Sequence, residues 1–121
     1  MTKKIALQIK NDIYRIGIEE ILKEVGEYSL YPYDNIEELK EQAIKFDLLL
    51  FEDKRIKDAG IRKIQIIEEN KVPLNIEHSL ITVKISKEEL KRAVDETQNK
   101  YLYIEERLKD IIELRKEQYN N

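Results

Sequence analysis

Apolar and polar residues succeed one another in the first part of the chain in a pattern that predicts a strand and then a helix. Over residues 5–9 every second side chain is a large aliphatic one, which is typical of a strand. The helix is predicted to start at a cap formed by Asn11 or Asp12. Apolar residues then recur at intervals of three and four as far as Gly26, where we expect the helix to end.

A second strand and a second helix are predicted next. Residues 28–33 read as a short strand, and Pro32 indicates an edge position because proline cannot donate a hydrogen bond to a neighbouring strand. Asp34 followed by Glu37 resembles a capping box that opens a helix. The buried side of this helix is expected to carry Ile36, Leu39 and Ala43.

The strand predicted over residues 47–51 has a different pattern. Its apolar residues run on without alternation, as in a strand buried on both faces of a parallel sheet, and stop at Glu52 and Asp53. The chain thus alternates strand, helix, strand, helix, strand. This order predicts an α/β fold with a mostly parallel sheet and helices on both of its faces.

The middle of the chain leaves two arrangements open. Three isoleucines spaced by three residues predict a third helix over residues 61–70. Two alternating apolar segments, 72–76 and 81–85, follow it. The link at residues 77–80 is too short for a parallel crossover, which needs about a dozen residues. The segments therefore form either an antiparallel hairpin or one strand with an extended connection.

The carboxyl-terminal part predicts two more helices. Ser86 and Glu89 form a capping box before the first of them. We expect an α/β domain over residues 1–98 and a helical extension over 99–121. The extension could dock on the sheet, pair with a second copy or lead into a further domain, and we expect a homodimer. The residues predicted to form its interface are Ile104, Leu108, Ile111 and Ile112.

Composition and charge exclude several classes of protein. The 121 residues include no cysteine, so no disulfide framework and no thiolate metal site is possible. The amino-terminal apolar stretch is short and broken by Gln8 and Lys10, so it is neither a signal peptide nor a membrane span. Interspersed charges with a net value of −3 give no basic stripe for DNA. We expect a soluble cytoplasmic protein with no direct contact to nucleic acid or membrane.

The candidate chemistry lies where the buried strand ends. Carboxylates such as Glu52 and Asp53, at the carboxyl end of a central strand, occupy the usual place of functional sites in open α/β sheets. The one histidine, His78, falls in a predicted turn with no recognisable nucleophile, so we expect a surface residue. We predict no catalytic residue, no enzymatic activity and no cofactor.

Four strings in the expected order resemble the receiver domain of response regulators of the NarL/LuxR type. They are IYRIGIEEIL, FDLLLFE, ITVKISKEELKRAV and NKYLYIEERLKDII, which begin at residues 13, 46, 81 and 99. The resemblance implies a flavodoxin-like fold and a role in two-component signalling. It places the phosphoacceptor position at Glu52 and the family's invariant lysine at Lys84.

The chain departs from the family at the positions that carry its chemistry. The phosphoacceptor is Glu52 instead of an aspartate, and Asp53 lies on the opposite face of the strand. The magnesium-binding acid pair falls on Asn11 and Asp12, or on Ile9 and Lys10 in another alignment, and is incomplete in both.

Two further departures lie between the third and fifth strands. No Ser or Thr ends the fourth strand, and Ser79 is the nearest one. The interval from Asp53 to Lys84 is too short for all the family's elements, so we expect the fourth helix to be lost and the partners to differ.

These departures favour a degenerate receiver, or pseudo-receiver, over a working phosphorylation switch. In this hypothesis Glu52 is not phosphorylated but reaches Lys84, with Lys10 as a second cation, and permanently replaces a phosphorylated aspartate. The protein would be a phosphorylation-independent regulatory module that binds proteins, in transcription regulation. The plainer alternative is that these strand-end charges have no common role.

Two other functions remain open. A working receiver would accept phosphate on Glu52 or Asp53, with Mg²⁺ held by Asp12 and Glu52. A structural or adaptor protein would oligomerise through its last helix. Magnesium binding separates the first of these from the other functions, because phosphoryl transfer to a carboxylate needs a cation to neutralise the phosphoryl oxygens.

Overall fold

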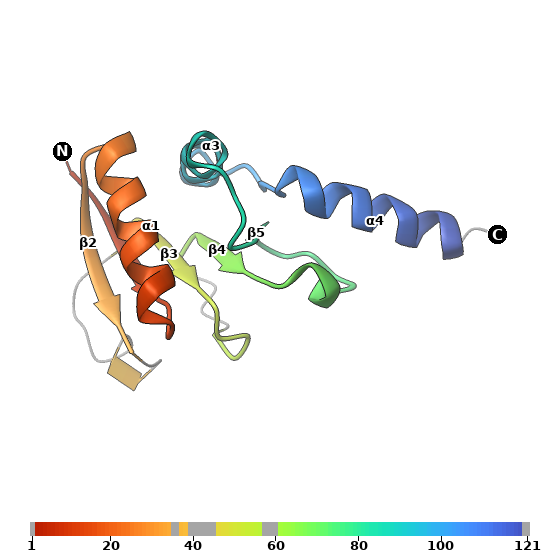
Figure 1. Ribbon diagram of the computed structural model, residues 1–121, viewed down its shortest axis with the longest axis horizontal. Helices are drawn as coiled ribbons and strands as arrows, with labels where there is room; N and C mark the ends of the chain where they lie inside the picture. Colours follow the sequence, from red (N-terminus) through yellow and green to blue (C-terminus); the bar gives the residue numbers. More distant parts are fainter. Residues whose placement is uncertain (1, 35–36, 39–45, 57–60, 120–121) are drawn as a thin grey trace.

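A computed structural model describes residues 2–34, 37–38, 46–56 and 61–119 of the chain (Figure 1). The elements are β1 (Lys3–Gln8), α1 (Asp12–Val25), β2 (Tyr28–Tyr33), β3 (Leu48–Phe51), β4 (Lys63–Ile66), the 3-10 turn η1 (Glu69–Lys71), β5 (Ser79–Ile81), α3 (Lys87–Gln98) and α4 (Glu106–Tyr119). Within the described residues no helix is long and apolar enough to cross a membrane.

The five strands form one parallel sheet in the order β2-β1-β3-β4-β5. This is the flavodoxin-like order expected for a receiver. The strand that carries Pro32 is at the edge, as predicted. All four residues of β3 are buried, and Gln8 at the end of β1 lies opposite Phe51 at the end of β3. The carboxyl ends of the central strands therefore meet at one edge of the sheet.

Alternate residues of each strand pack on opposite faces of the sheet. On one face Leu7 and Leu50 belong to a core that includes Leu22 of α1 and Leu90 of α3. A smaller cluster on the other face has Ala6, Leu49, Phe51 and Ile56 as its buried members. The helix predicted to cover that second face, with Ile36, Leu39 and Ala43, lies outside the described residues apart from Glu37 and Glu38.

Two predicted helix caps are present in the structure. The Asn11 side chain accepts hydrogen bonds from the backbone N–H groups of Ile13 and Tyr14, at 2.9 and 3.2 Å. The Ser86 hydroxyl accepts one from the backbone N–H of Glu89, at 3.1 Å. Each bond satisfies a donor that the first turn of a helix otherwise leaves free, so the local sequence sets where α1 and α3 begin.

The third helix predicted over residues 61–70 is wrong, because β4 occupies Lys63–Ile66. Ile64 and Ile66 are buried as alternate residues of a strand. The spacing of three from Ile61 to Ile67 imitates a helical period over a segment too short to decide between the two.

The hairpin considered for residues 72–85 is also absent. β5 pairs in parallel with β4, so the extended-connection alternative is correct. The described link between these strands contains the 3-10 turn η1 and no α-helix. The loss of the fourth helix is confirmed in this part of the chain.

The segment after α3 joins the edge of the sheet and leads into α4. The backbone N–H of Leu80 donates to the carbonyl of Tyr103 at 2.9 Å, and that of Glu105 donates to the carbonyl of Leu80 at 3.0 Å. α4 then runs away from the sheet, with the carboxyl terminus at the opposite end of the molecule from β2 (Figure 1). The first residues of the predicted extension thus share the core of the sheet.

Candidate functional site

Glu52 and Asp53 directly follow β3 and are held by Gln8 from β1. The Gln8 side-chain oxygen accepts the backbone N–H of Glu52 at 3.2 Å and that of Asp53 at 3.0 Å. Gln8 is fully buried, and its Nε2 has no hydrogen-bond partner among the described residues. A buried amide from the neighbouring strand therefore fixes the backbone at Glu52, the predicted phosphoacceptor position.

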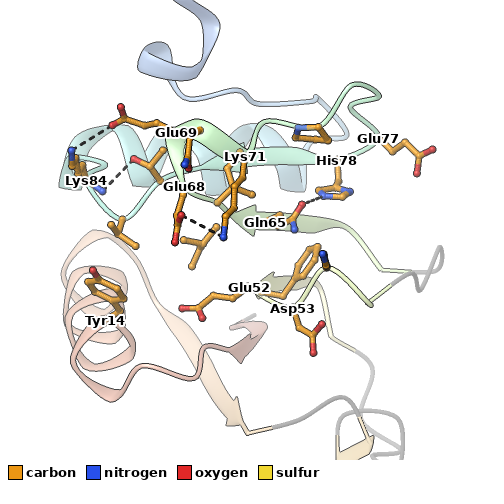
Figure 2. Close-up of a pocket in the computed structure, with 18 of the residues that line it drawn as sticks. Tyr14, Glu52, Asp53, Gln65, Glu68, Glu69, Lys71, Glu77, His78 and Lys84 are labelled. Atoms are coloured by element: carbon orange, nitrogen blue, oxygen red, sulfur yellow. Dashed lines mark hydrogen bonds and ion pairs between the residues drawn. The ribbon is translucent and has the colours of Figure 1, made fainter. Parts of the chain in front are cut away.

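Glu52 is half-buried, and its carboxylate points into the opening between Tyr14 and the pair formed by Glu68 and Lys71 (Figure 2). Burial raises the pKa of the Glu52 carboxyl above its usual value. A hydrogen bond from the backbone N–H of Lys10 and the charge of that lysine lower the pKa in part. Of the two cations predicted around Glu52, the structure brings Lys10 to it.

Asp53 points away from Glu52 and binds its own neighbour in the chain (Figure 2). The Arg55 guanidinium donates to Asp53 Oδ2 at 2.7 Å and to Oδ1 at 3.0 Å. These hydrogen bonds lower the pKa of the Asp53 carboxyl to about 2. Asp53 is thus engaged in a local ion pair, and its carboxylate does not face that of Glu52.

Lys84 does not pair with Glu52, so this predicted contact is wrong. Lys84 Nζ lies 3.6 Å from Glu69 Oε1, and its side chain is 68% exposed. Figure 2 shows this pair on the far side of the opening from Glu52. The turn η1, which stands where the family has a helix, supplies the carboxylate that binds the lysine.

The residues predicted at the acid pair serve the start of α1. Asn11 caps the helix, and Asp12 binds Arg15 at 2.8 Å with a largely exposed side chain. Ile9 is buried and Lys10 exposed at the two positions that follow β1. In the described part of the chain no three His, Cys, Asp or Glu residues are grouped so that they could hold a metal ion. The weaker alternative, a metal held by the pair Asp12 and Glu52, stays a prediction.

Ser79 does not replace the missing hydroxyl at the end of β4. It is the first residue of β5, and its Oγ lies 2.7 Å from the hydroxyl oxygen of Thr97 and accepts the backbone N–H of Tyr103 at 3.0 Å. β4 ends at Ile66, and the residues that follow are Ile67 and Glu68.

His78 is half-buried, so its assignment as a surface residue is wrong. Its Nε2 lies 2.8 Å from the side-chain oxygen of Gln65, and its ring centroid lies 5.3 Å from that of Phe51. Burial and the charge of Lys63 lower the pKa of the imidazole below its usual value. His78 therefore packs on the second face of the sheet.

A hollow of about 1020 Å³ opens at the carboxyl edge of the sheet. We call it the carboxyl-edge hollow, and it is lined by residues 14, 51–54, 65–71, 73, 75, 77–78 and 82–84. About half of this lining comes from the link between β4 and β5. The hollow brings together Glu52, Asp53 and Lys84, while Lys10, Asn11 and Asp12 do not line it.

The stripe predicted to form a dimer interface packs inside the chain. Leu108 is fully buried in a cluster with Val72 and Leu80. The partly buried residues packed against this cluster include Ile104, Ile111 and Ile112. A dimer that used all four residues would have to remove α4 from its own sheet.

A buried carboxylate that the sequence did not reveal joins α4 to β5. Glu105 is 1% exposed, and its Oε2 lies 2.6 Å from Arg107 Nε. Its Oε1 accepts the backbone N–H of Thr82 at 2.7 Å. Arg107 also contacts Glu69 at 3.3 Å, so the network reaches the carboxylate that binds Lys84. No local pattern could have indicated the contacts of Glu105 with Thr82 and of Arg107 with Glu69, because they join residues 23 and 38 positions apart.

The comparison with solved structures agrees with this geometry. The crystal structure of the response regulator ChrA from a heme-sensing two-component system matches with a TM-score of 0.69 and 11% sequence identity. The match covers 94% of this chain and 65% of the ChrA chain. The fold is that of a response-regulator receiver. At this identity the likeness concerns the fold alone, and the chain spans just under two thirds of ChrA. No protein-family model and no curated protein matches the sequence.

Proposed function

We propose that this chain is a non-enzymatic, receiver-like regulatory module that binds protein partners without being phosphorylated. The observation that carries the proposal is the surroundings of Glu52, which are the Gln8 amide and Lys10 instead of a pair of acids. Phosphoryl transfer to a carboxylate needs a cation that neutralises the phosphoryl oxygens. Mg²⁺ in turn needs nearly ideal oxygen geometry, which one carboxylate beside a lysine does not provide.

The positions of the other two family residues support the same proposal. Lys84 is held by Glu69, and Asp53 is held by Arg55. Glu52 is one methylene longer than an aspartate, and a misplacement of about 1 Å can cost about 10²-fold in rate. The geometry gives no support to a permanent phosphate mimic acting through Lys84. It favours a carboxylate that stays free for a partner.

Control of transcription would then act through a bound protein. A net charge of −3 without a basic stripe disfavours direct contact with DNA. Dimerisation through α4 stays a prediction, and the burial of Leu108 favours docking of the helix on its own chain.

The experiment is a magnesium titration followed by amide NMR spectroscopy. We expect no saturable shifts at residues 8–12 and 52–53 at millimolar Mg²⁺. Saturable shifts at these residues would instead support a working receiver. The double variant Lys10→Asp, Glu52→Asp is the positive control, because it places a second carboxylate beside the shortened one.

A further inference from the structure

The lining of the carboxyl-edge hollow includes apolar side chains such as Tyr14 and Val83 together with charged ones. Among the charged side chains, Glu52 is half-buried and lacks an ion pair to any described residue. Of the three lysines in the lining, Lys71 binds Glu68 at 3.5 Å and Lys84 binds Glu69 at 3.6 Å, and the third is Lys54. Glu52, in contrast, forms no ion pair in the described part of the chain. Burial already disfavours its charged form, so a cation brought by a partner would meet a desolvated carboxylate.

The charge balance of the hollow favours a basic partner. Its lining includes five carboxylates and three lysines, a formal excess of two negative charges. Asp53 is already bound to Arg55, and Glu77 is exposed and points outward (Figure 2). Glu52 points inward and accepts a hydrogen bond from the backbone N–H of Lys10, but it forms no ion pair among the described residues. It is therefore the contact that we expect for an incoming basic side chain.

The hollow has room for a short piece of helix. An α-helix with its side chains is about 10–12 Å across and rises about 1.5 Å per residue, so about 1020 Å³ corresponds to about seven residues, or two turns. The connection beside it, between β4 and β5, holds the turn η1 where a parallel crossover usually has a helix. Helix-sized space is therefore expected at this connection.

Exposed apolar side chains on both walls favour a protein over a small ion. Tyr14 on α1 and Val83 after β5 line the hollow and are 44% and 45% exposed. Ile13 and Ile16 of α1 are also exposed, at 80% and 54%, but they lie outside the lining of the hollow. Exposed apolar groups of this kind at a groove indicate an interaction surface.

From these observations we propose that the carboxyl-edge hollow binds an amphipathic helix of a partner protein, with an Arg or Lys on Glu52 and apolar residues against Tyr14 and Val83. This is recognition of a helix in a groove, in which residues at intervals of three and four make the contacts. Arginine suits the position better than lysine, because its planar fork can bind both carboxylate oxygens. The inference rests on the proposed function and names the chemistry of its partner.

The test is a displayed library of helical peptides, selected on the full chain with counter-selection on Glu52→Lys. We expect the enriched peptides to share a basic residue with apolar residues three or four positions away. Their amide shifts should map to Tyr14, Glu52, Ile67 and Val83. Calorimetry should show binding at least about tenfold weaker for Glu52→Gln. Glu20→Gln, on the exposed side of α1 and outside the hollow, is the matched control and should bind as the wild type does.

Three results would overturn the inference. The first is enrichment of peptides that have no basic residue. The second is amide shifts at residues outside the hollow, and the third is peptides that bind the Glu52→Lys chain as well as they bind the wild type. The amide spectrum of each variant shows whether it is folded. If the chain takes up phosphate or magnesium, the proposed function fails. If the chain takes up neither phosphate nor magnesium and no basic helix binds, the inference about the hollow fails while the proposed function still stands.

Discussion

Glu105 binds Thr82 with both carboxylate oxygens and thereby joins the start of α4 to the end of β5. Glu105 Oε1 accepts the backbone N–H of Thr82 at 2.7 Å, and the Thr82 hydroxyl lies 3.0 Å from each carboxylate oxygen. The ion pair with Arg107 completes the set of partners. A buried carboxylate is tolerated only when it is paired and hydrogen-bonded in this way. The contact therefore fixes how α4 leaves the sheet.

Removing this carboxylate should destabilise the fold. We expect Glu105→Ala to lower the free energy of unfolding by about 3 kcal/mol, because it leaves the buried N–H and hydroxyl of Thr82 without their acceptor and removes the shorter ion pair of Arg107. Urea denaturation measures the loss. The control is Glu113→Ala on the same helix, whose ion pair with Lys116 at 3.7 Å is exposed and should contribute less than about 1 kcal/mol. Equal effects of the two variants would contradict the structural role of Glu105.

Docking of α4 predicts different effects for two leucines of that helix. Leu108 is fully buried, whereas Leu114 is 60% exposed. Leu108→Ala should cost about 2–5 kcal/mol of stability, because it leaves a cavity in the cluster with Val72 and Leu80. Leu114→Ala should change stability by less than about 0.5 kcal/mol. A Leu108→Ala chain that keeps its stability but loses a dimer in light scattering would show that the stripe is an interface between copies.

Asp53 and Glu52 should titrate on opposite sides of the ordinary carboxyl range. The Arg55 hydrogen bonds place the pKa of Asp53 at about 2, so the stability it contributes is present above its usual 3.8 and is lost as pH falls toward 2. Burial raises the pKa of Glu52 on folding, so lowering the pH through the range just above 4.5 favours the folded state instead.

Carbon-detected NMR of the carboxyl groups follows both titrations. Arg55→Ala should raise the pKa of Asp53 toward 3.8 and leave Glu52 unchanged. Titration of both groups together near 4 would show that the arrangement described for this edge is wrong.

His78 should make the fold less stable in mild acid. Its pKa is lowered on folding by burial, so the unfolded chain takes up a proton more readily and stability falls as the pH drops below about 6.5. As the chain has one histidine, a proton NMR titration reports its pKa without ambiguity. In urea denaturation, His78→Gln should lose less stability than the wild type between pH 7.5 and 5.5. An imidazole pKa at or above 6.5 would contradict the burial.

The elements that sequence predicts well are those with strong local signals. Asn11 and Ser86 cap their helices through bonds to residues two or three positions away, so the sequence alone is enough to place them. The unbroken apolar run that forms β3 likewise indicates a strand in the middle of the sheet. β4 was misassigned because four residues are too few to separate a period of two from one of three or four.

The candidate site was predicted in part, because its contacts depend on the fold. The strand-end position of Glu52 is local and was found. The Gln8 amide that holds it lies 44 positions away, and in sequence it marks only a polar break in an apolar strand. Pairing of Lys84 with Glu69 depends on the turn η1, which the sequence pattern of residues 61–70 does not reveal.

The most direct test of the account is incubation of the full chain with acetyl phosphate and Mg²⁺, followed by intact-mass spectrometry. We predict no phosphoryl adduct on the wild-type chain, and none on Glu52→Asp, because Lys10 still lies where an acid is needed. A phosphoryl mass on the wild type that disappears in Glu52→Ala would contradict the account and show that the chain is a working receiver.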